Sequence, residues 1–98
     1  MELNMSISGI NGTQNILSSM AKIRVEQGII TSAKIIGDKG RYEIHFTNPE
    51  AQWNDQNLTL SSTRDPYEPK QFKSLDGAIA DLKRIGLMNA EVVIVSEM

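Results

Sequence analysis

The sequence lacks several residue types on which catalytic and metal sites are commonly built. Its 98 residues include no cysteine, one histidine and three prolines, and aromatic residues make up only 5% of the chain. The absence of cysteine excludes disulfides, thiolate nucleophiles and thiolate metal ligands, and it suits a reducing compartment, so we expect a cytoplasmic protein. A single histidine excludes a metal site built from several imidazoles.

The chain also lacks a long apolar run and a strong excess of charge. No apolar stretch approaches the ~18 residues that a membrane helix requires, so no membrane partner is expected. The first residues, MELNMSISGI, lack the basic and apolar segments of a Sec signal. Twelve acidic and ten basic residues give a net charge of −2. Because proteins held on nucleic acid by phosphate contacts are usually basic, this balance argues against that role unless basic residues cluster locally.

What is present is typical of one small globular domain that covers residues 1–98. Apolar residues make up 40% of the chain and charged residues 22%, which are ordinary values for globular proteins. A chain of this length buries one modest core, about 60–65% of its unfolded surface, so we expect no second domain.

Periodicity and turn signals predict an α+β fold. Alternation of apolar and polar residues predicts strands, and apolar residues spaced three and four apart predict helices. Strands are expected over 2–8, 29–36, 41–47, 58–63 and 91–95, and helices over 13–27 and 75–85. The order (β)αβββαβ favours a two-layer fold in which two helices cover one face of a mostly antiparallel sheet.

Particular residues set the boundaries of these elements. Thr13 and Ser74 are expected to cap the two helices at their N-termini, and Gly86 is expected to end the second. The stretch GDKG, residues 37–40, predicts the tight turn of a β-hairpin. Because VVIV at the centre of 91–95 is apolar on both faces, we expect this strand to be central, either inserted beside one of the three middle strands or paired across a dimer interface.

Candidates for catalysis are few. Glu43 and His45 lie on the same face of a predicted strand, an arrangement that general acid–base chemistry can use. A solvated cross-strand pair is the favoured interpretation, and a small enzyme built on these two residues is the weaker alternative. The glycine turn opens no helix, so it does not predict a phosphate site, and the acidic residues lack calcium-loop spacing. We expect no enzymatic activity and no cofactor.

Six cations are the first candidate for a binding surface. Three belong to the hairpin over 34–41 and three to the loop over 64–73. They are Lys34, Lys39, Arg41, Arg64, Lys70 and Lys73. Acidic residues such as Asp38 and Glu68 interleave with them and neutralise much of their field. Nucleic-acid binding through these two segments is therefore an alternative rather than the favoured function.

Two aromatic residues in polar loops are the second candidate. Trp53, the only tryptophan, falls in the predicted loop over 48–57, and Tyr67 falls in the loop over 64–73. A tryptophan in such a loop either folds back over the core or stands at a partner interface, where tryptophan is enriched. Trp53 and Tyr67 are the expected aromatic part of a protein-docking surface.

The run LTLSSTRDPYEPKQFKSLDGAIADLKRIG, residues 58–86, shows a family likeness. It resembles the C-terminal pattern of small accessory proteins of plasmids and other mobile elements, some of them associated with partition. The matching positions are Leu60, Arg64, Lys70, Phe72, Ser74, Leu75, Asp76, Ile85 and Gly86. The prolines of the loop, Pro66 and Pro69, make it longer than in that pattern. The resemblance implies a small cytoplasmic accessory or binding protein and supplies no catalytic residues.

The sequence thus favours a non-enzymatic accessory protein that acts through contacts with a protein partner. A homodimer is expected, because the sheet has at least one long edge and segment 2–8 has no evident strand to pair with. The contact surface is expected to comprise the 34–41 hairpin and the 64–73 loop.

Overall fold

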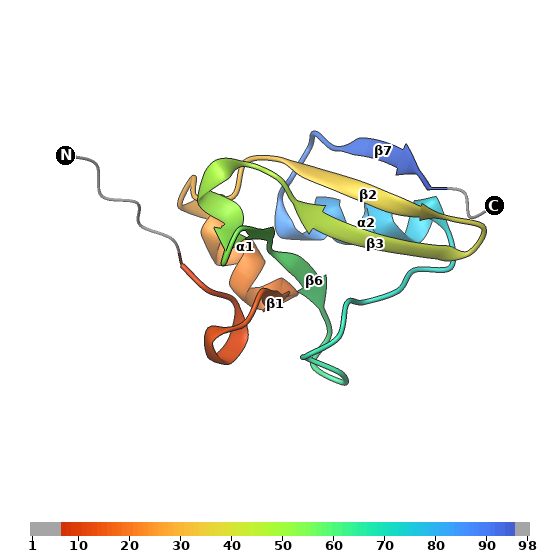
Figure 1. The fold of residues 1–98 in the computed structure, drawn as a ribbon. Helices are drawn as coiled ribbons and strands as arrows, with labels where there is room; N and C mark the ends of the chain where they lie inside the picture. Colours follow the sequence, from red (N-terminus) through yellow and green to blue (C-terminus); the bar gives the residue numbers. More distant parts are fainter. Residues whose placement is uncertain (1–6, 96–98) are drawn as a thin grey trace.

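The computed structural model describes residues 7–95 of the chain. These residues form a five-stranded sheet, a two-stranded sheet and two α-helices (Figure 1). The strands are β1 (Asn15–Leu17), β2 (Ala33–Asp38), β3 (Arg41–Phe46), β4 (Gln52–Trp53), β5 (Gln56–Asn57), β6 (Thr59–Ser61) and β7 (Glu91–Ile94), and the helices are α1 (Ser18–Glu26) and α2 (Leu75–Ile85). Two short 3-10 turns, η1 (Ile10–Gly12) and η2 (Pro49–Ala51), precede β1 and β4.

The larger sheet has the strand order β1-β6-β3-β2-β7. Its centre is an antiparallel meander, since β2 pairs with β3 and β3 pairs with β6. Both outer strands pair in parallel, β1 with β6 and β7 with β2. The predicted α+β class is therefore confirmed, with a sheet that is antiparallel at its centre and mixed at its edges.

Both helices lie on one face of the sheet, and the core fills the space between the two layers (Figure 1). In β3 the predicted alternation is observed, since Ile44 and Phe46 are fully buried beneath the helices while Arg41 is exposed. The largest buried side chains are Phe46, Ile16, Ile30, Ile35, Ile44, Leu58, Leu60 and Ile85. We call the opposite side of the sheet, which carries Glu43 and His45, the open face.

The β2–β3 hairpin forms where the sequence predicts. Its turn residues Lys39 and Gly40 have φ angles of 44° and 82°, the left-handed geometry that matches the twist of a two-residue hairpin. The predicted loop over 48–57 contains a second hairpin, β4–β5, whose turn residues Asn54 and Asp55 also have positive φ.

Helix α2 also agrees with the prediction. The Ser74 hydroxyl accepts a hydrogen bond from the backbone N–H of Gly77 at 3.1 Å, which satisfies a donor of the first turn. Gly86 ends the helix in the left-handed conformation. Asp76 in the first turn and the cations of the last turn suit the helix dipole.

The first helix is shorter than predicted. The expected helix over 13–27 begins only at Ser18, and no side chain caps it. The Thr13 hydroxyl instead donates to the carbonyl of Ile10 at 2.7 Å and accepts from the N–H of Asn15 at 3.2 Å. Thr13 is therefore not a helix cap.

The start of the predicted helix is a strand because it has a distant partner. Residues 15–17 pair in parallel with residues 59–61 of β6, and Ile16 lies fully buried beside Leu60. Helical periodicity is a local signal, and here a pairing far along the chain outweighs it. The predicted strand over 2–8 lies almost wholly outside the described residues.

Strand β7 lies at the edge of the sheet and not at its centre, which corrects the prediction (blue in Figure 1). It pairs with β2, and Val92 and Ile94 are 47% and 55% exposed. Apolar residues on both faces of a strand indicate that both faces are buried. They do not show whether the covering residues belong to the same chain or to a partner. Within residues 7–95, no helix is long and apolar enough to cross a membrane.

Candidate binding surfaces

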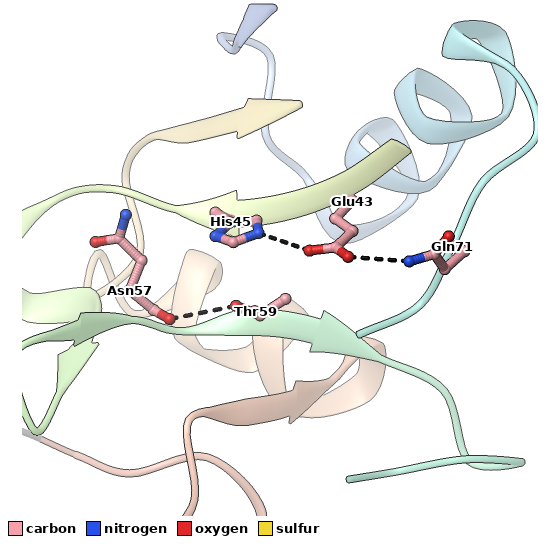
Figure 2. Close-up of polar contacts among 5 residues, drawn as sticks. All are labelled: Glu43, His45, Asn57, Thr59 and Gln71. Carbon is pink, nitrogen blue, oxygen red and sulfur yellow. Dashed lines mark hydrogen bonds and ion pairs between the residues drawn. The ribbon is translucent and has the colours of Figure 1, made fainter. Parts of the chain in front are cut away.

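The predicted acid–base pair forms a contact on the open face (Figure 2). Nε2 of His45 lies 3.0 Å from Oε1 of Glu43, and Nε2 of Gln71 donates to Oε2 of the same carboxylate at 3.0 Å. Glu43 and His45 project from β3, whereas Gln71 belongs to the segment that precedes α2. Both oxygens of Glu43 are thus engaged, and the contacts tie that segment to the sheet.

The surroundings of His45 resemble a surface contact more than a catalytic site. The side chains of His45 and Glu43 are 25% and 29% exposed. Thr59 lies opposite His45 in the register, but its hydroxyl donates to the carbonyl of Asn57 at 3.3 Å (Figure 2). Among the described residues, the imidazole has Glu43 as its hydrogen-bond partner, and no hydroxyl nucleophile is positioned by it.

Lys70, whose side chain is 35% exposed, forms an ion pair within the protein. Its Nζ donates to Oδ2 of Asp81 at 2.8 Å and lies 5.0 Å from the centroid of the Phe72 ring. Arg84 binds the other oxygen of Asp81 at 2.9 Å, and the Asp81 side chain is only 8% exposed. Because a buried carboxylate requires paired cations, Lys70 anchors the 64–73 loop to α2, and its charge is used within the protein.

The two halves of the 64–73 loop reach different parts of the molecule. Beyond Lys70, the loop passes the hairpin, since a side chain on Gly40 would meet the carbonyl of Lys73 at 3.6 Å. Before Lys70, the loop reaches η1, where the hydroxyl of Tyr67 accepts a hydrogen bond from the side-chain amide of Asn11. Arg64 is exposed near the start of the loop.

The hairpin cations lie among acidic residues. Lys39 and Arg41 line a surface hollow of about 530 Å³ together with Asp38 and Glu43. Lys34 lies farther along β2, where its register partners on the neighbouring strands are His45 and Glu91. The structure thus brings Lys39, Arg41 and Lys73 to one end of the sheet, in a field of mixed sign.

Trp53 and Tyr67 line one hollow of about 480 Å³ beside β1. The indole N–H of Trp53 donates to the carbonyl of Gly12 at 3.1 Å, and its ring packs partly against the core. Tyr67 is 49% exposed. Trp53 thus folds back on the body of the protein, the first of the two outcomes expected for it, and a place at a partner interface stays a prediction.

The outer edge of β7 is a surface that the sequence did not single out. Met88 is 82% exposed, and Val92, Ile94 and Val95 are each about half exposed. Beside them lies an apolar hollow of about 230 Å³, lined by Ile79 and Met88 among others. The signal that could have found it is VVIV, a strand apolar on both faces, combined with the lack of an assigned neighbour.

Comparisons with known proteins add no second line of argument. The chain matches no protein-family model, and no curated protein or solved structure is significantly similar to it. Within the part of the chain that the structure describes, no group of three or more potential metal ligands comes together. A proposal for the function therefore rests on the surfaces described above.

Proposed function

We propose that this chain is a non-enzymatic accessory protein that acts through protein–protein contacts, and that it pairs with a second copy of itself along β7. The observation that supports the proposal is that the amino-acid composition of β7 is typical of a central strand, whereas β7 lies at the edge of the sheet. Its VVIV stretch has the composition of a strand buried on both faces, yet Val92 and Ile94 are 47% and 55% exposed at a sheet edge. A partner strand would bury them.

The backbone of β7 is oriented to receive such a strand. The N–H of Val95 donates to the carbonyl of Gly37 in β2 at 3.0 Å. Because successive residues of a strand alternate in direction, the polar groups of Val93 also face β2, whereas those of Val92 and Ile94 face outward. An outward row of backbone donors and acceptors, flanked by apolar side chains, is a template for another strand.

The charges along β7 favour an antiparallel pairing of two copies. A two-fold axis at Val93 places Val92 opposite Ile94 of the second copy, so that these residues exchange both backbone hydrogen bonds. The same axis places Glu91 opposite Val95, so that the two carboxylates lie at opposite ends of the pair. No like charges face each other, and two five-stranded sheets join into one.

A dimer of this form leaves the loop surface predicted from the sequence free for a different protein. The first half of the 64–73 loop lies beside β1, at the other edge of the sheet. The 34–41 hairpin borders the proposed pairing, since β2 pairs with β7 and Val95 lines the hollow of Lys39 and Arg41. Each dimer would present the loop surface twice, which increases the avidity for a partner that also has two sites. This arrangement suits an accessory protein of the mobile-element type that residues 58–86 resemble.

Sedimentation equilibrium of the full chain tests the proposal, with one matched control. Ile94→Lys places a charge in the proposed pairing and should raise the dimer dissociation constant at least about 100-fold. Ile23→Lys makes the same change on α1 at a residue of equal exposure, 53% against 55%, and should leave the dimer intact.

A second variant separates loss of pairing from loss of folding. Ile94→Pro removes an N–H that faces outward, together with the isoleucine side chain, and leaves the hydrogen bonds of β7 to β2 intact, since proline is tolerated on edge strands. It should dissociate the dimer while the monomer keeps the circular dichroism and melting temperature of Ile94→Lys. A wild-type chain that is monomeric at about 100 μM, or a dimer that survives both variants, would contradict the proposal.

A further inference from the structure

Three segments far apart in the sequence enclose the hollow that Trp53 and Tyr67 share. They are residues 12–15, the β4–β5 hairpin and residues 67–69 of the long loop. The volume of about 480 Å³ lies within the range of small-molecule sites, roughly 300–1,000 Å³. We call this space the aromatic hollow.

Asn15 is the observation that points to a ligand. The residue is 8% exposed, and it lines the aromatic hollow from β1. Its backbone N–H donates to the Thr13 hydroxyl, but its side-chain amide makes no hydrogen bond with any described residue. Among the described residues, only the Ser61 hydroxyl is a fully buried side-chain polar group without a partner, so the amide of Asn15 keeps access to solvent, where a ligand in the hollow can reach it.

The contrast with Asn48 shows how unusual this amide is. Asn48 is 6% exposed, much like Asn15. Its side-chain oxygen accepts from the N–H of Thr31, and its amide nitrogen donates to the carbonyl of Ile29 and to Glu50. The fold thus bonds the amide of Asn48 on every side, whereas the amide of Asn15, a residue that lines the hollow, bonds no described residue and keeps access to solvent.

The other lining groups indicate a polar ligand without negative charge. The side chains of Gln14, Asn54 and Gln56 each offer a donor and an acceptor, and Glu68 offers a carboxylate. No cation is among the described residues that line the hollow. A phosphate or carboxylate placed there would face Glu68 without compensation.

The two aromatic rings add apolar surface to this polar lining. The N–H of Trp53 is already bonded to Gly12, so the indole offers a ligand its apolar ring. A ligand that suits the hollow therefore combines an apolar ring surface with several groups that both donate and accept hydrogen bonds. Sugars have this combination, since each hydroxyl does both and the C–H groups of the ring form an apolar patch.

We infer that the aromatic hollow is a binding site for an uncharged saccharide, with Asn15 as the buried hydrogen-bonding residue and Trp53 and Tyr67 as apolar contacts. The inference does not depend on pairing along β7, because the hollow lies at the opposite edge of the sheet. A neutral nucleoside has a ring and hydroxyls as well, but its flat base needs a broader apolar slot than a lining of four amides and a carboxylate provides.

Trp53 makes the test direct, since it is the only tryptophan in the chain and lines the hollow. Its emission would be followed in titrations with glucose, galactose, mannose, N-acetylglucosamine and their β-1,4-linked disaccharides, with adenosine and uridine as the comparison. We expect a saturable change with at least one sugar at a dissociation constant of about 1 mM or below, and none with the nucleosides.

Asn15→Leu is the decisive variant, and Asn48→Leu is its matched control. Asn15→Leu should weaken sugar binding at least about tenfold and change the melting temperature little, because the amide bonds no described residue and leucine has a similar size. Asn48→Leu should lower the melting temperature, because it leaves bonded partners unsatisfied. Failure of every sugar to bind at about 10 mM overturns the inference. Preference for a nucleoside, or unchanged sugar binding in Asn15→Leu, overturns it equally.

Discussion

The two edge strands of the five-stranded sheet, β1 and β7, differ in whether the same chain covers them. At the β1 edge, Gly9 of the same chain lies against Asn15 at the start of the strand, and Ile7 and Ser8 before it are bonded to α1. At the β7 edge, none of the described residues pairs with the outer side of the strand, and its side chains are mostly apolar. Because proteins cover, charge or pair their sheet edges, the uncovered edge is where a partner is expected.

The cover at the β1 edge depends on two residues. Arg24 of α1 donates to the carbonyls of Ser8 at 2.6 Å and Ile7 at 3.3 Å, and burial lowers the pKa of its guanidinium from the ordinary value. Gly9 lies so close to the strand that a Cβ would stand 1.8 Å from the carbonyl oxygen of Asn15. A side chain at residue 9 is therefore incompatible with the cover.

Gly9→Ala would break the covered edge and should have the largest effect on stability. The added methyl group forces residues 7–9 away from β1, which should cost about 2–3 kcal/mol of unfolding free energy. Urea denaturation measures this change, and Ser8→Ala, next to it, should cost no more than about 0.5 kcal/mol. If the two variants are equally stable, the cover does not contribute to the fold.

Arg24→Met should loosen the same edge by a smaller amount. Methionine keeps much of the apolar stem but loses both hydrogen bonds to the backbone, for an expected cost of about 1–2 kcal/mol. The control is Lys22→Met on the exposed side of α1, which should cost less than about 0.5 kcal/mol. The amide of Gly9 should exchange faster in Arg24→Met alone, and equal exchange in both variants would contradict this role.

The comparison of the edges also shows what the sequence could predict. Helix α2 and the β2–β3 hairpin depend on local signals, namely the Ser74 cap, the Gly86 stop and the Lys39-Gly40 turn, and these were identified. The two outer strands depend on distant partners. The sequence predicts the start of a helix where β1 forms. It predicts a central position for β7, because composition indicates burial without showing which residues provide it.

The residues of the candidate surfaces also differ in whether the sequence alone could identify them. Residue type alone drew attention to Trp53 and Tyr67, which the structure brings to one hollow. It could not draw attention to Asn15, because only the folded structure shows that this residue lines the hollow and that its amide bonds no described residue. Lys70 had the features of a surface cation, but Asp81, eleven residues later on α2, binds it. Such pairings depend on the tertiary structure and cannot be predicted from a single sequence.

Hydrogen exchange of the β7 amides at two protein concentrations tests the pairing of two copies most directly. Val93 and Val95 face β2, so their amides should exchange slowly at both concentrations. Val92 and Ile94 face outward, so their amides should become at least about tenfold more protected when the dimer forms and lose that protection on dilution. Fast exchange of Val92 and Ile94 at every concentration would contradict pairing along β7.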